Sequence, residues 1–147
     1  MKPEGRILAI DYGSRRIGLA LSDPLGITAQ GLETLEVNSA EEALERLEDL
    51  ASTYEVSRVV VGIPINMDGS YGEKAEEVAG FARALEKGTG LPVALWDERL
   101  TSVAAMRTMH EMGVRTKGRK KDLDRIAATI LLQGYLSRMG RNSECDR

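Results

Sequence analysis

Short apolar runs separated by turn residues occupy the first quarter of the chain. The runs from Arg6 to Asp11 and from Ile17 to Ser22 flank a glycine-containing turn, a pattern that predicts a β-hairpin. The segment from Ile27 to Val37 predicts a third strand, with an irregularity near Gly31. We therefore expect three consecutive antiparallel strands in this part of the chain.

Beyond these strands the apolar spacing changes to that of helices alternating with short buried strands. The predicted elements are a helix capped by Asn38 or Ser39 and ending near Tyr54, a strand from Val59 to Ile63, a helix from Glu73 to Lys87, a strand from Pro92 to Trp96, a helix from Thr101 or Ser102 to Met112, and a helix from Leu123 to Met139. The continuous β-branched run at 59–63 is typical of a strand buried on both faces.

This order of elements predicts an α/β fold with a mixed five-stranded sheet flanked by helices. Three antiparallel strands come first, and the later strands join in parallel through right-handed crossovers. At 147 residues we expect a single domain over residues 1–147, with 141–147 as a flexible tail. No apolar run is long enough to span a bilayer or to form a signal peptide, so we expect a cytoplasmic protein without a membrane partner.

Acidic residues stand at the ends of three predicted core elements. Asp11 ends a buried strand, Asp97 and Glu98 follow another, and Asp122 and Asp124 open the last helix. Each acid also has a purely structural interpretation, in a turn, at a helix dipole or as a cap. Because neighbouring strand residues point to opposite faces, only one of Asp97 and Glu98 can share a site with Asp11. Carboxylates without a histidine or cysteine set suit a hard cation, Mg²⁺ or Mn²⁺.

Positive charge is concentrated in one segment of an otherwise acidic chain. The net charge is −3, which does not by itself indicate a nucleic-acid partner. The segment 115–121, however, carries five positive charges in seven residues. We interpret it as a cationic loop that delivers a phosphate backbone to the acids. The candidate nucleic-acid contacts are Arg15, Arg16, Arg99, Arg115, Lys117, Arg119, Lys120 and Lys121. The first three are next to the acids in sequence, so the alternatives for them are to offset buried negative charge or to lie on the surface without a role.

Four sequence motifs together resemble one known family. The segments DYGSRRIGLALSD, VVVGIPINMDGS, LWDERLTS and DRIAATILLQGYL are similar to those of the YqgF family, also called RuvX, of pre-16S rRNA nucleases and Holliday-junction-resolvase-like proteins. The similarity runs from Arg6 to Leu136. It implies an RNase H-like fold and metal-dependent hydrolysis of phosphodiester bonds, with Asp11, Glu98 and Asp124 as catalytic and metal-binding acids.

The resemblance also implies a substrate and partners. We expect processing of the 5′ end of precursor 16S rRNA in ribosome biogenesis, with Mg²⁺ or Mn²⁺ as cofactor, and ribosomal particles as further partners of a monomer or homodimer. The alternatives are a Holliday junction resolvase acting on DNA and a non-catalytic nucleic-acid-binding assembly factor. A Walker-type ATPase is excluded, because Leu19 and Ala20 stand where a P-loop requires Lys and Ser or Thr. Actin-like ATPases share a similar Asp-x-Gly turn but close two such domains around the nucleotide.

Overall fold

The computed structural model describes residues 5–100 and 120–145, with side chains at 5–100 and 124–139. Its elements are β1 (Arg6–Asp11), β2 (Arg16–Ser22), β3 (Ala29–Glu36), α1 (Ala40–Thr53), β4 (Val56–Ile63), α2 (Glu73–Thr89), β5 (Val93–Asp97), the short 3-10 helix η1 (Glu98–Leu100) and α4 (Lys120–Cys145). The predicted helix from 101 or 102 to 112 lies outside the described residues.

The strands form one five-stranded sheet in the order β3-β2-β1-β4-β5. β1 pairs with β2, and β2 with β3, in antiparallel fashion, whereas β4 runs parallel to both β1 and β5. The predicted mixed sheet is therefore confirmed. Because β1, β4 and β5 run in the same direction, their carboxyl ends meet at one edge of the sheet.

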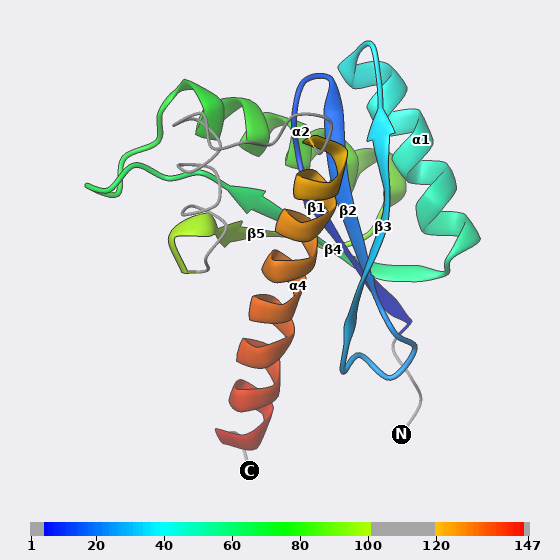
Figure 1. Cartoon of the computed structure of the whole chain (residues 1–147), viewed down its shortest axis with the longest axis vertical. Coiled ribbons are helices and arrows are strands. Elements are labelled where there is room, and N and C mark those ends of the chain that lie inside the picture. Colours follow the sequence, from blue (N-terminus) through cyan, green and yellow to red (C-terminus); the bar gives the residue numbers. More distant parts are fainter. Residues whose placement is uncertain (1–4, 101–119, 146–147) are drawn as a thin grey trace.

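Helices cover the two faces of the sheet unequally, with α1 and α2 on one face and α4 on the other (Figure 1). Large residues such as Leu8 and Ile10 face the first pair of helices. Small residues, Ala9 and Ala20 among them, face α4. A long helix can lie close to the sheet there because those side chains take little space. Alternation along β1 then directs Asp11 to the same face as Ala9.

Local capping explains where α1 begins and where α2 ends. The Ser39 hydroxyl accepts a hydrogen bond from the Glu42 amide at 3.1 Å, so Ser39 rather than Asn38 is the capping residue. The Glu42 carboxylate also accepts a hydrogen bond, at 2.9 Å, from the amide of Asn38, the residue before the cap, and this contact fixes the approach of the chain to α1. Gly90, in the left-handed conformation, ends α2.

The irregularity predicted near Gly31 is present just after it, where the register of β2 with β3 shifts between Leu32 and Leu35, while Gly31 itself pairs with Ala20. One feature differs from the sequence prediction. The last helix runs to Cys145 and thus includes residues 141–145, which were assigned to the tail. No proline interrupts it, and Gly140 alone is too weak a breaker to end it. Among the described residues, no helix combines the length and the apolar character needed to cross a membrane.

Candidate active site

Asp11 lies at the carboxyl end of β1 between two glycines. It is only 5% exposed. Across the antiparallel pair it stands opposite Gly18 of β2. On the other side, Ile10 pairs with Val61, so the next residue of β4, Gly62, is beside Asp11. The buried carboxylate is thus flanked by positions without side chains, on the face of the sheet that α4 covers.

Each of these glycines makes room for another acid. A methyl group on Gly18 would collide with the backbone carbonyl of Asp124, at the start of α4. A methyl group on Gly62 would collide with Leu131 and would lie 2.9 Å from the Glu98 carboxylate oxygen Oε2. The structure therefore brings the three predicted acids to one face and one edge of the sheet, with Asp11 between the other two.

Glu98 and Asp97 diverge, as alternation along a strand requires. Glu98 begins η1 and is 2% exposed. Asp97 pairs in register with Ile63, whose side chain belongs to the core beneath α1 and α2. Its carboxylate binds the Arg99 guanidinium, with 2.8 Å between Nη2 and Oδ2. This pairing holds the pKa of Asp97 below its ordinary value, so Asp97 is ionised and engaged outside the buried site.

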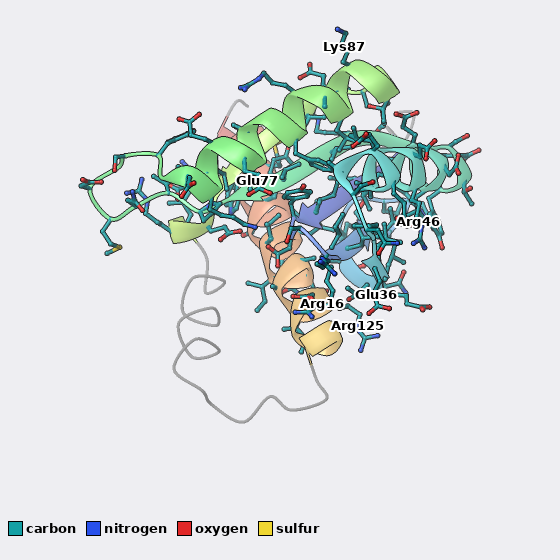
Figure 2. The ribbon with its side chains drawn as sticks, turned by 90° about the horizontal axis from the view of Figure 1, so that it is seen from above. Arg16, Glu36, Arg46, Glu77, Lys87 and Arg125 are labelled. Atoms are coloured by element: carbon teal, nitrogen blue, oxygen red, sulfur yellow. The ribbon has the colours of Figure 1, made fainter. Side chains whose placement is uncertain are left out.

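Asp124 is the most accessible of the three acids. Its carboxylate accepts a hydrogen bond from Arg16 Nε at 3.0 Å, and the two side chains are 25% and 35% exposed, respectively. Figure 2, which looks down from above, shows Arg16 beside the first turns of α4. Of the two roles predicted for Arg16, phosphate contact or compensation of acidic charge, the structure shows the second, because Arg16 pairs with one of the three clustered acids.

The donor set suits a hard divalent cation. Two carboxylates that are almost fully buried are costly unless positive charge or hydrogen bonds compensate them. Asp11 and Glu98 both have polar partners in the structure, so neither is isolated. No three acidic, histidine or cysteine side chains among the described residues stand close enough to enclose a metal ion. Asp124 would have to leave Arg16 to complete such a set.

The remaining predicted nucleic-acid contacts divide into three groups. Arg15 is exposed in the turn between β1 and β2, on the edge that carries Asp11. The guanidinium of Arg99 is occupied by protein acceptors. Positions 115, 117 and 119 lie outside the described residues, and Lys120 and Lys121 begin α4 without described side chains.

Gly18 and Gly62 were not recognised as site residues from the sequence. The available signal was a glycine inside a strand, which marks a bulge or the close approach of another segment. Gly18 was predicted only as a position within the strand from Ile17 to Ser22. The segment that approaches each glycine comes from far along the chain, α4 in one case and η1 in the other, so local sequence could not identify it.

The amino-acid sequence is similar to those of known proteins over most of the chain. The profile of the RuvX family, described as "Holliday junction resolvase", matches residues 5–138. The chain belongs to the RuvX family. Two RuvX relatives named "Putative pre-16S rRNA nuclease" come from Clostridium acetobutylicum, 48% identical over 90% of this chain and 98% of the relative, and from Moorella thermoacetica, 49% identical over 93% and 98%. The predicted family is confirmed.

Solved structures of low sequence identity share the fold of this RuvX chain. RuvC of T. thermophilus in complex with a Holliday junction substrate superposes with a TM-score of 0.57 at 17% identity, covering 92% of this chain and 96% of RuvC. The Fowlpox virus resolvase bound to Holliday junction DNA gives a TM-score of 0.55 at 12% identity, covering 91% and 98%. The predicted RNase H-like fold is confirmed by these likenesses.

Proposed function

We propose that this chain is a nuclease that uses Mg²⁺ or Mn²⁺ to hydrolyse phosphodiester bonds in precursor 16S rRNA, at its 5′ end. The observation that carries the proposal is the placement of two buried carboxylates, Asp11 beside Gly62 and Glu98 above it, with Asp124 above Gly18. The names of the relatives support the substrate. An enzyme that cleaves precursor 16S rRNA would act in the cytoplasm and would have ribosomal particles as partners, as expected from the sequence.

The residues of the site have distinct roles in this proposal. Asp11 and Glu98 would hold the cation from the sheet edge, and Asp124 would join them if its carboxylate left Arg16. The chemistry that such a cation would supply is activation of water and stabilisation of the leaving oxygen. Arg15 and the released Arg16 contact the phosphate backbone beside the acids. The cationic segment 115–121, immediately before Asp124 in the chain, guides the same backbone.

The packing of α4 against the sheet supports this assignment of roles. Because α4 lies on the small residues of the sheet, its first turns carry Asp124 to Gly18 without a loop between them. Site residues on helices and strands are held more precisely than those on loops. The assignment therefore places all three acids on regular elements of the fold.

A DNA junction is the second candidate substrate. The family description and the two resolvase complexes favour it. Sequence-independent phosphate contacts serve either nucleic acid equally well, so the acids do not discriminate between them. A junction resolvase would use two symmetry-related sites, and this alternative therefore requires a homodimer.

Cleavage of matched RNA and DNA panels tests the proposal. Wild type with Mg²⁺ should cut precursor 16S rRNA, whereas Asp11→Asn, Glu98→Gln and Asp124→Asn should each abolish cleavage. Asp49→Asn, an exposed change on α1, is the matched control and should cut normally. Undiminished cleavage by all three acid variants would contradict the site. Preferential cutting of four-way DNA junctions by a dimer would select the second candidate.

A further inference from the structure

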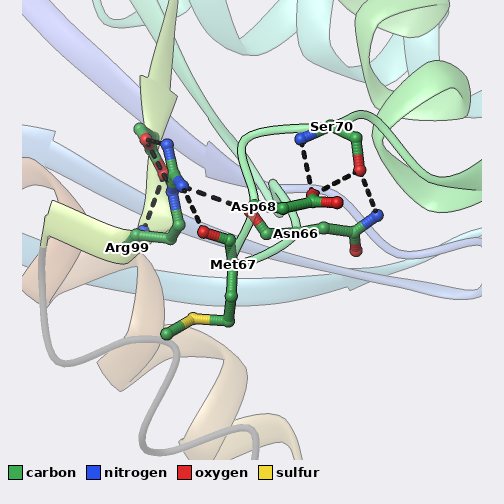
Figure 3. Close-up of polar contacts among 6 residues, drawn as sticks. Asn66, Met67, Asp68, Ser70 and Arg99 are labelled. Carbon is green, nitrogen blue, oxygen red and sulfur yellow. Dashed lines mark hydrogen bonds and ion pairs between the residues drawn. The ribbon is translucent and has the colours of Figure 1, made fainter.

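Arg99 directly follows Glu98, and its guanidinium is held by protein acceptors on two sides (Figure 3). Its Nε and Nη2 atoms donate to the Asp97 carboxylate, at 3.0 Å and 2.8 Å from Oδ2. Its Nη1 atom donates to the backbone carbonyls of Asn66, at 3.1 Å, and Met67, at 3.4 Å. All three guanidinium nitrogens therefore donate to protein acceptors, and the pair of Nε and Nη2 that could bind a phosphate in bidentate fashion is occupied by Asp97.

The contacts between Asp97 and Arg99 also restrain Glu98, the residue between them in the chain. The backbone amide of Arg99 also donates to Asp97 Oδ1, at 2.9 Å. Asp97 and Arg99 are thus joined through both main chain and side chain, and Glu98 is the residue between them. The backbone of Glu98 is fixed by its two neighbours while its side chain is buried beside Gly62.

The loop that accepts the Nη1 hydrogen bonds is itself ordered by internal contacts. The amide of Asn66 donates to the carbonyl of Ser70 at 3.0 Å, and the Asn66 side chain donates to the Ser70 hydroxyl at 3.1 Å. Asp68 accepts from the Ser70 amide at 2.9 Å and from its hydroxyl at 2.6 Å. Arg99 therefore connects η1 to a loop whose conformation is stabilised by its own hydrogen bonds.

We propose that Arg99 is a positioning residue, which locks Glu98 in place by tying η1 to Asp97 and to the loop 66–70, and that it does not contact substrate phosphate. The inference rests on the proposed function of Glu98 as a metal-binding acid. Sub-ångström placement of such a ligand matters, because displacements of about 1 Å at a catalytic site can cost on the order of 100-fold in rate. Glu98 reaches over Gly62, where any side chain would take the space that its carboxylate needs, because an added methyl group would lie 2.9 Å from Oε2.

Two substitutions of Arg99 separate a tie from a phosphate contact. Lysine keeps the positive charge, which suffices for a phosphate, but it loses the planar fork that binds Asp97 and the loop carbonyls together. Arg99→Lys should therefore behave like Arg99→Gln if Arg99 is a tie, and like wild type if it grips phosphate. Asp97→Asn weakens the same tie without altering Arg99. Arg83→Gln, an exposed arginine change on α2, is the control.

Three measurements on the full chain distinguish a positioning role of Arg99 from a phosphate contact. Mn²⁺ affinity, from calorimetry without nucleic acid, should fall about 10-fold in Arg99→Gln and Arg99→Lys, within the range seen when groups that orient metal ligands are removed. The slope of log affinity against log salt for a single-stranded RNA should stay at the wild-type value. Amide hydrogen exchange in the loop 66–70 should accelerate in both variants and, more mildly, in Asp97→Asn.

The proposal is overturned if Arg99→Gln flattens the salt slope by ~0.7, the value of one phosphate contact on a single strand, while Arg99→Lys retains wild-type binding. Unchanged amide exchange in the loop 66–70 of both Arg99 variants also overturns the proposal. If those variants do not fold, the same measurement is made on Asp97→Asn, where unchanged exchange overturns the proposal and faster exchange supports it. Failure of the proposed function looks different, because wild type would then bind no Mn²⁺ whatever the exchange rates.

Discussion

Arg16 and Asp124 form an ion pair, 3.0 Å between Nε and Oδ2, that links the first residue of β2 to the amino-terminal turns of α4. Asp124 is one of the three acids gathered at the sheet edge, so a bound cation and Arg16 compete for the same carboxylate. The pair is partly exposed, and exposed ion pairs contribute little to folding stability. Its consequences should therefore be seen in metal binding rather than in the stability of the fold.

Arg16→Gln should increase the stabilisation that Mn²⁺ confers, because it removes both the competitor for Asp124 and a nearby positive charge. Without metal the free energy of unfolding should fall by no more than about 1 kcal/mol, as for other exposed pairs. Thermal unfolding with and without Mn²⁺ measures both quantities. A metal-induced shift equal to that of wild type would show that Arg16 does not restrain Asp124.

Mg²⁺ should stabilise the wild-type protein, because a ligand that binds only the folded state adds about 2.7 kcal/mol at 100 times its dissociation constant. Asp11→Asn and Glu98→Gln should lose this stabilisation, since each replaces a buried, negatively charged carboxylate by a neutral amide. Asp49→Asn should keep it. Melting curves over a series of Mg²⁺ concentrations provide the test, and equal shifts in all four proteins would argue that the cation binds elsewhere.

Gly18→Ala should destabilise the fold by about 1 to 3 kcal/mol, as overpacking does, because the added methyl group collides with the backbone of Asp124. Gly80→Ala is the matched control. That position is inside α2 and has no contact closer than 3.9 Å, so alanine should stabilise the protein by roughly 0.5 to 1 kcal/mol. Denaturant unfolding compares the two changes. A neutral Gly18→Ala would mean that α4 can lift from the sheet at little cost.

Asp23 should make stability depend on pH at the acidic end. Backbone amides of Thr28, Ile27 and Leu25 donate to its carboxylate and hold its pKa below the ordinary value. A lowered folded-state pKa gives stability that is complete above the unfolded-state value of about 3.9 and disappears as pH falls through the folded-state pKa. The advantage of wild type over Asp23→Asn should follow that course in unfolding measured from pH 6 to pH 2. A difference independent of pH would contradict it.

Neutralising Lys117, Arg119 and Lys120 together should weaken binding to unrelated RNA sequences. The slope of log affinity against log salt should flatten by up to about 2, at ~0.7 per lost phosphate contact on a single strand. Filter binding across a range of salt concentrations measures this slope. If affinity and slope both match wild type while Asp11→Asn still abolishes cleavage, the segment only connects its neighbours and the substrate follows another path.

The sequence by itself determined the order of elements, the mixed sheet and the candidate acids. Strand and helix patterns depend on neighbours a few positions apart, so the hairpin of β1 with β2 and the buried run of β4 could be predicted from local spacing. Alternation likewise indicated that Asp97 and Glu98 diverge. The family motifs, which are also local, singled out Asp124 from Asp122.

Only the tertiary structure decided how these residues meet. The approach of Asp124 to Gly18, the place of Glu98 above Gly62 and the pairing of Arg16 with Asp124 each join segments distant in the chain. Such contacts depend on strand register and on how closely α4 packs against the alanines of the sheet, and no local pattern encodes either quantity. The same holds for Arg99, which the sequence assigned to phosphate and the folded chain binds to Asp97 and the loop carbonyls, because a side chain's partners are set by what the fold brings within hydrogen-bond distance.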